Sequence, residues 1–347
     1  MISVSSGASG LARSFKHRRA LKLTGTLLAV AAVAGAIGVG SAAASSKPLS
    51  GKTVTIVSLT NSNPWAAVYN TVIKTYMTGL GAKVNILGAS TASQQVQMLE
   101  SAVAEKPNLI FLEALDSSAV APAIAKAKAE HVTIINTDGP AEASVTSGLH
   151  QVLSNNYQLG QYAAENLVEG FQQEHLKKAD IGVIEGTAAM LVTQDRMKGF
   201  NQILHKYPQY KVVSLQSNDW DPVQSGQQAT QMFAKFGKSG LQGMYGMADY
   251  MAVPIVTAAK QAGITIGVKH HGLIITGSNC FKVGIDAIRA GQLFGTATED
   301  PGTISALAAK YGAQLLQGKK VPMVETVQEK RITAANLSKY SAQCSKA

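Results

Sequence analysis

The chain has 347 residues, of which 46% are hydrophobic and 15% charged, so it can bury a large core and lacks the composition of a disordered protein. At roughly 100 to 200 residues per domain, this length predicts two domains. The net charge of +10 falls to +5 without residues 1–44, because that segment holds five of the 31 basic residues and none of the 21 acidic ones. No basic run follows Lys47, which argues against nucleic acid as a partner.

Residues 1–44 have the composition of an export signal. Basic residues between Arg13 and Lys22 precede the uncharged stretch 23–39, and small residues around Ala44 form an A-x-A-like cleavage site. We therefore expect an exported protein, periplasmic or extracellular, that is cleaved after Ala44. The sequence at 17–22 partly matches a twin-arginine signal, and Sec export fits equally well. The alternative is an uncleaved membrane anchor, since about 17 to 25 apolar residues can span a bilayer.

From residue 53 onward, β-branched runs alternate with segments of helical periodicity. The first series predicts strands at 53–59, 83–87, 108–112 and 132–136 and helices at 65–80, 93–105 and 119–130. The second begins near Ser154 and predicts strands at 179–184, 211–215, 243–246 and 272–276 and helices at 157–174, 193–205, 223–236, 252–262 and 282–290. A short strand at 295–297, a helix at 303–317 and an extended segment at 324–328 follow. This repeated alternation predicts an α/β protein with two doubly wound lobes, each built on a parallel sheet.

Polar and aromatic residues cluster just after the predicted strands, where open α/β sheets bind their ligands. These candidates are Asn63, Trp65, Glu113, Asp138, Trp220, Asp249, Asn279 and Glu299. One flat aromatic ring from each half could stack on a small ring while carboxylates, amides and Arg196 bind its hydroxyls, which predicts a sugar or polyol ligand. The alternatives are that both Trp residues are buried loop anchors, that Asp138 caps a turn and that Arg196 forms a surface ion pair.

The chain has two cysteines, Cys280 and Cys344. An exported chain meets an oxidising compartment, so we predict a disulfide between them. Two unpaired thiols are the alternative, because the sequence does not show that their Cα atoms come within bonding distance. Two cysteines argue against a metal site, and we expect no cofactor.

Several motifs occur in an order that resembles the type I periplasmic sugar-binding proteins, the ribose-binding group of ABC transporter components. They lie between residues 52 and 336, at 63–65, 138, 195–200, 248–252, 277–279, 290–292 and 296–301. The resemblance implies a three-segment hinge near residues 154, 299 and 327. It implies a first lobe of residues 52–153 and 300–326 and a second lobe of residues 154–299 and 327–347. It also implies that Arg196 contacts the ligand.

The same resemblance implies an extracytoplasmic solute-binding component of an ABC importer, which closes over its ligand and docks on a membrane permease. We expect it to act as a monomer. At four positions the chain departs from ribose binders: Gly139 replaces an Arg, Ala248 replaces an Asn, and Glu113 and Glu299 stand where neutral amides are usual. These changes predict a ligand rich in hydroxyl donors, such as a polyol, a different sugar or one carrying an amine.

Three other functions compete with this one. An enzyme acting on sugars is disfavoured, because no nucleophile elbow, metalloprotease motif or P-loop is present and the adjacent His270 and His271 suit neither a dyad nor one metal. A sugar-responsive transcription factor would need a DNA-reading module where the export segment lies. An exported sensor that feeds a chemoreceptor or sensor kinase remains an alternative.

Overall fold

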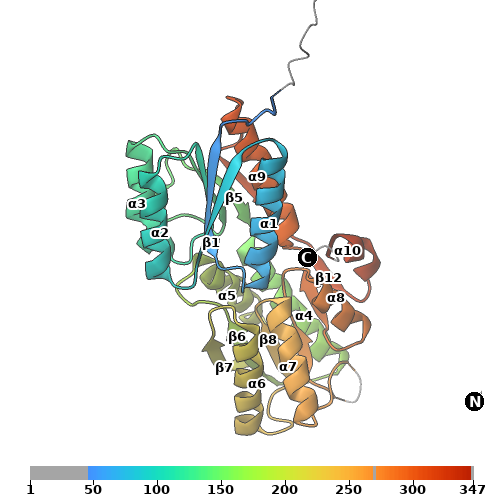
Figure 1. The fold of residues 1–347 in the computed structure, drawn as a ribbon. Coiled ribbons are helices and arrows are strands. Elements are labelled where there is room, and N and C mark those ends of the chain that lie inside the picture. The colour runs from blue at the N-terminus through green and yellow to red at the C-terminus, as the bar shows by residue number, and fades with distance from the viewer. Residues whose placement is uncertain (1–45, 269–270, 345–347) are drawn as a thin grey trace, which may run out of the picture. The chain divides into compact units, whose positions relative to one another are not determined.

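The computed structural model describes residues 46–268 and 271–344, which form two α/β lobes (Figure 1). Each lobe is built on a six-stranded sheet. The predicted export segment 1–44 and its cleavage site lie outside the described residues, as do His270 and residues 345–347. No helix of the described ranges is long and apolar enough to cross a membrane.

The first lobe contains a wholly parallel sheet with the strand order β11-β5-β4-β3-β1-β2. Its strands are β1 (Thr53–Leu59), β2 (Lys83–Ala89), β3 (Leu109–Leu112), β4 (Ile134–Asp138), β5 (His150–Ser154) and β11 (Val324–Val327). Its helices are α1 (Pro64–Gly79), α2 (Ala92–Ala104), α3 (Ser117–Ala129) and α9 (Pro301–Leu316), with a 3-10 turn at Ala143–Val145.

The central strands of this sheet are buried on both faces, which explains why buried and exposed residues do not alternate along them. Helices α1 and α9 pack together, as do α2 and α3. Along β1, Ile56 belongs to the core cluster that includes Tyr69 of α1, whereas Val57 belongs to the cluster that includes Leu99 of α2. Successive residues therefore face opposite helical layers.

The second lobe has the strand order β12-β10-β9-β8-β6-β7. Its strands are β6 (Ala179–Glu185), β7 (Tyr210–Ser217), β8 (Gly243–Gly246), β9 (Ile274–Thr276), β10 (Gly295–Ala297) and β12 (Arg331–Thr333). Its helices are α4 (Asn156–Gln173), α5 (Leu191–Leu204), α6 (Pro222–Phe236), α7 (Asp249–Gln261), α8 (Lys282–Arg289) and α10 (Leu337–Cys344). The sheet is parallel except for β12, which pairs antiparallel with β10.

The predicted fold class, two parallel-sheet α/β lobes, is confirmed, and the differences lie at short elements. The sequence prediction missed β5, β12 and α10, and it did not foresee the antiparallel edge strand. Strand β5 carries polar His150 and Gln151, and β12 has only three residues, so neither gives a hydrophobic run. The chain passes from one sheet to the other three times, after β5, after β10 and after β11.

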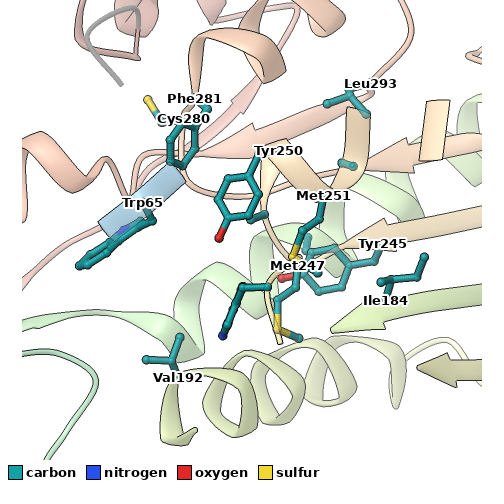
Figure 2. Packing of buried hydrophobic residues seen from close by; sticks show 14 of the residues in the cluster. Trp65, Ile184, Val192, Tyr245, Met247, Tyr250, Met251, Cys280, Phe281 and Leu293 are labelled. Carbon is teal, nitrogen blue, oxygen red and sulfur yellow. The ribbon is translucent and has the colours of Figure 1, made fainter. Parts of the chain in front are cut away.

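The predicted disulfide is formed in the structure. Cys280 and Cys344 are bonded, with their Cα atoms 4.8 Å apart, and both are fully buried. The bond links α10 to the loop that precedes α8, and Figure 2 shows Cys280 next to Phe281 at the start of that helix. The loop that follows β9 is therefore covalently held to the end of the described chain.

Candidate ligand-binding site

A small cavity lies where the C-terminal ends of strands from both lobes meet. Its lining comes from the last residues of β1 and β4 and from the loops and helices that follow β1, β3, β6, β7, β8 and β9. It comprises Leu59, Asn63, Trp65, Glu113, Asp138, Met190, Val192, Arg196, Trp220, Tyr250 and Asn279. The volume of about 20 Å³ has room for about one water molecule. The two lobes are thus closed tightly over this space.

The sequence-predicted candidates converge here with two exceptions. Seven of the nine line the cavity, whereas Asp249 and Glu299 lie behind its wall. Asp249 is fully buried and accepts a hydrogen bond from the Phe281 N–H at 2.9 Å, so it fixes the loop that carries Asn279. Glu299 instead bonds the side chains of three lining residues, as described below.

The start of α1 supplies the first-lobe wall. Asn63 caps the helix, because its Oδ1 accepts from the Ala66 N–H at 3.0 Å and a proline occupies the first helical position. Its Nδ2 reaches across to the Tyr250 hydroxyl at 3.4 Å. Trp65 stacks on Tyr69 with ring centroids 5.0 Å apart. Figure 2 shows the Tyr250 hydroxyl pointing toward the space between Trp65 and Val192.

Trp220 supplies the aromatic wall of the second lobe. Asp219 and Trp220 have φ angles of 54° and 62°, in the left-handed region, which turns the indole back toward β6. The indole nitrogen lies 3.1 Å from the Met190 sulfur, and the Arg196 guanidinium carbon lies 5.2 Å from the ring centroid. A Cβ at Gly186 would lie 1.9 Å from Trp220 Cε2, so only glycine admits the ring here.

Gly186→Ala should therefore displace the Trp220 ring and weaken ligand binding by about tenfold or more. The intrinsic fluorescence should change as well, because Trp220 and Trp65 are the chain's only two tryptophans. Gly226→Ala in α6 is the matched control, since an added Cβ there meets nothing closer than 3.5 Å. Unchanged fluorescence and affinity in Gly186→Ala would contradict this account of the wall.

Arg196 lies at the centre of the second-lobe wall and is 1% exposed. Its Nε donates to Asn156 Oδ1 at 2.8 Å, and its Nη1 donates to the Met247 carbonyl at 2.8 Å and to Asn279 Oδ1 at 2.9 Å. Helix α5 approaches α4 closely at this point, because a Cβ on Gly160 would lie 1.8 Å from the Arg196 carbonyl oxygen. The alternative that Arg196 forms a surface ion pair is thus wrong.

Glu299 joins the two lobes at the back of the cavity. Its carboxylate accepts from Trp65 Nε1 at 3.0 Å, from Ser154 Oγ at 3.1 Å and from Asn279 Nδ2, and it lies 3.5 Å from Arg196 Nη2. Burial raises the pKa of Glu299 well above its usual range, and Arg196 offsets part of that rise. One carboxylate therefore connects residues of both lobes.

Two further carboxylates, Glu113 and Asp138, line the cavity from the first lobe. Burial raises the pKa of Glu113 to about 8, with a further contribution from the charge of Asp138. Burial also raises the pKa of Asp138, although Arg196 opposes the rise. Asp138 has a φ of 66° and accepts from Asn156 Nδ2 at 3.4 Å, an interlobe contact rather than the turn cap considered above.

The sequence did not indicate four lining residues: Leu59, Met190, Val192 and Tyr250. Three of them are apolar and carry no chemistry that marks a site. Tyr250 follows Asp249 directly and falls within a motif at 248–252, so its position was a usable signal. Of the histidine pair, His271 is exposed and bonded to Glu174, and His270 is outside the described residues.

Residues 54–320 match the family model described as "Periplasmic binding protein domain", which covers more than half of the chain. The chain belongs to the periplasmic binding protein family. This family consists of substrate-binding proteins of ABC transporters, which are extracytoplasmic and are not enzymes. The predicted family is confirmed.

Curated relatives of this periplasmic binding protein include the ribose import binding protein RbsB of Bacillus subtilis (strain 168), 26% identical over 70% of this chain and 74% of the relative. The xylitol-binding protein of Mycolicibacterium smegmatis is 23% identical over 66% and 62%. Among solved structures, the Caulobacter myo-inositol binding protein has a TM-score of 0.76 at 19% identity, covering 84% of this chain and 96% of that one. This structural likeness confirms the type I fold.

Proposed function

We propose that this periplasmic binding protein is the solute-binding component of an ABC importer and captures a sugar or polyol between its lobes. The observation that carries the proposal is the cavity, where Trp65 and Trp220 approach from opposite lobes among carboxylates, amides and one guanidinium. Flat rings suit the C–H faces of a sugar and the polar groups suit its hydroxyls. Curated relatives named for ribose, D-apiose, xylitol and galactofuranose support this ligand class.

The lobes must separate to admit such a ligand, because the closed cavity measures about 20 Å³. We propose the three crossings near residues 154, 299 and 327 as the hinge, with the lobes divided at those points. Two crossings are bonded to each other, since the Thr298 N–H donates to the Lys330 carbonyl at 3.0 Å. A ligand that contacts both lobes binds the closed state better and so shifts the population toward it.

The departures from ribose binders support a ligand other than ribose. A Cβ on Gly139 would meet Val192 Cγ2 at 2.8 Å, so the closed lobes leave no space for an arginine at that position. Glu113 brings a carboxylate acceptor into the cavity lining where an amide is usual, which favours a ligand with many hydroxyl donors. The remaining parts of the proposal are export through the segment 1–44 with cleavage after Ala44, action as a monomer, docking on a membrane permease and no nucleic-acid partner.

A thermal-shift panel of sugars, polyols and amino sugars tests the function. A true ligand at 100 times its Kd should stabilise the protein by about 2.7 kcal/mol, a rise of several degrees in Tm. Asp138→Ala should lose this stabilisation, whereas Asp286→Ala, which removes an exposed carboxylate of α8, should keep it. Absence of stabilisation by every compound, or full stabilisation of Asp138→Ala, would contradict the proposal.

A further inference from the structure

The cavity region contains more acidic than basic side chains. Three buried carboxyl groups, Glu113, Asp138 and Glu299, are 2–4% exposed, and Arg196 is the one basic residue among the described residues of the site. A buried carboxylate without a cation or sufficient hydrogen bonds is costly, because desolvation is not offset. The distribution of partners shows which of the three lacks compensation.

Glu299 has the most partners of the three, because it lies beside Arg196 and accepts hydrogen bonds from Trp65, Ser154 and Asn279. Asp138 has the Asn156 amide and the favourable charge of Arg196. Glu113 has one hydrogen bond, from the Leu59 N–H to Oε2 at 3.2 Å. Within the described part of the chain, no Lys, Arg or His forms an ion pair with Glu113, and its Oε1 has no hydrogen-bond partner.

Glu113 lines the cavity together with three aromatic residues, Trp65, Trp220 and Tyr250. Aromatic faces attract cations, and the attraction increases when the site is desolvated. A compact ammonium with three donors could bond the free Glu113 oxygen and Asp138 at once. A neutral hydroxyl would supply a hydrogen bond there but no charge.

We infer that the ligand carries a protonated primary amine that lies against Glu113, which makes it an amino sugar, an amino polyol or an aminocyclitol. This inference rests on the proposed function, since it specifies the substrate class of the same cavity. The amine supplies the cation that the protein omits beside Glu113. The hydroxyl groups of the ligand then bond Arg196, Asn279 and Asp138, as the proposed function requires.

Isothermal titration with matched ligand pairs tests the inference at pH 7. The pairs are glucosamine and glucose, and 1-amino-1-deoxysorbitol and sorbitol, which differ by an amine in place of a hydroxyl. The wild-type protein should bind the amine of at least one pair about tenfold or more tightly than its hydroxyl partner. This comparison within the wild-type protein does not depend on the folding of any variant.

Glu113→Gln keeps an acceptor for the Leu59 N–H but removes the charge, so it should lose the preference for the amine and keep binding of the hydroxyl partner. Glu130→Gln, which changes a partly exposed first-lobe carboxylate paired with Lys106, should retain the preference. Equal or tighter binding of the hydroxyl partners, or a preference retained by Glu113→Gln, would overturn the inference alone. If neither member of any pair bound, the proposed function would fail with it.

Discussion

Arg196→Met is expected to abolish ligand binding and to lower the free energy of unfolding by about 3–5 kcal/mol, the usual cost of removing one partner from a buried ion pair. Arg196 bonds residues of α4, of the β8 loop and of the β9 loop, and it is the cation beside Glu299. The buried network predicts destabilisation without ligand as well.

Denaturant unfolding and isothermal titration measure the two effects of Arg196→Met separately. Arg289→Met is the control, because Arg289 is half exposed and pairs with Asp286 one turn away in α8. Its loss should change the stability by less than about 1 kcal/mol. A stability of Arg196→Met equal to that of the control would show that the buried network carries no net stabilisation.

Removal of the disulfide by Cys280→Ala with Cys344→Ala is expected to destabilise the protein by about 4 kcal/mol, because the bond closes a loop with a sequence separation of 64. Affinity should fall too. Asn279 precedes Cys280, and both residues have left-handed φ angles, 86° and 57°, in the loop that the disulfide holds. A freed loop would hold the Asn279 amide less firmly against Arg196.

Unfolding of the wild-type protein with and without a reductant measures this effect. The reductant should lower wild-type stability to that of the double variant and should leave the double variant unchanged. If the reduced and oxidised wild-type proteins had equal midpoints and equal ligand affinities, the disulfide would have neither role.

The sequence predicted those helices and strands that have a clear hydrophobic pattern of their own. Strand β1 begins with five consecutive β-branched residues, 53–57, which suit a strand buried on both faces, so it was recognised from the sequence. Strand β5 was missed because its sequence is partly polar and has no hydrophobic run. It is a strand because it pairs with β4 and β11. Pairing of that kind depends on residues far away in the chain.

The candidate site likewise contains residues that the sequence predicted and contacts that it did not. Trp65 and Asp138 were predicted because the ends of parallel strands meet at one edge of a sheet. The burial of Arg196 was not predictable from its helix, since it depends on the close approach of α4 at Gly160. Val192 of the second lobe lies beside Gly139 of the first lobe only because the two lobes pack together. Relations between lobes have no local sequence signal.

Strands β11 and β12 lie late in the sequence, so each sheet is completed only after most of the chain has been synthesised. Strand β11 completes the first sheet beside β5, and β12 completes the second beside β10, yet both follow α9. An emerging polypeptide therefore holds five strands of the first sheet with the backbone of β5 exposed as an open edge, which invites wrong pairing and aggregation. Each lobe therefore includes strands from both parts of the chain, and we expect truncation before β11 to leave both sheets without an edge strand.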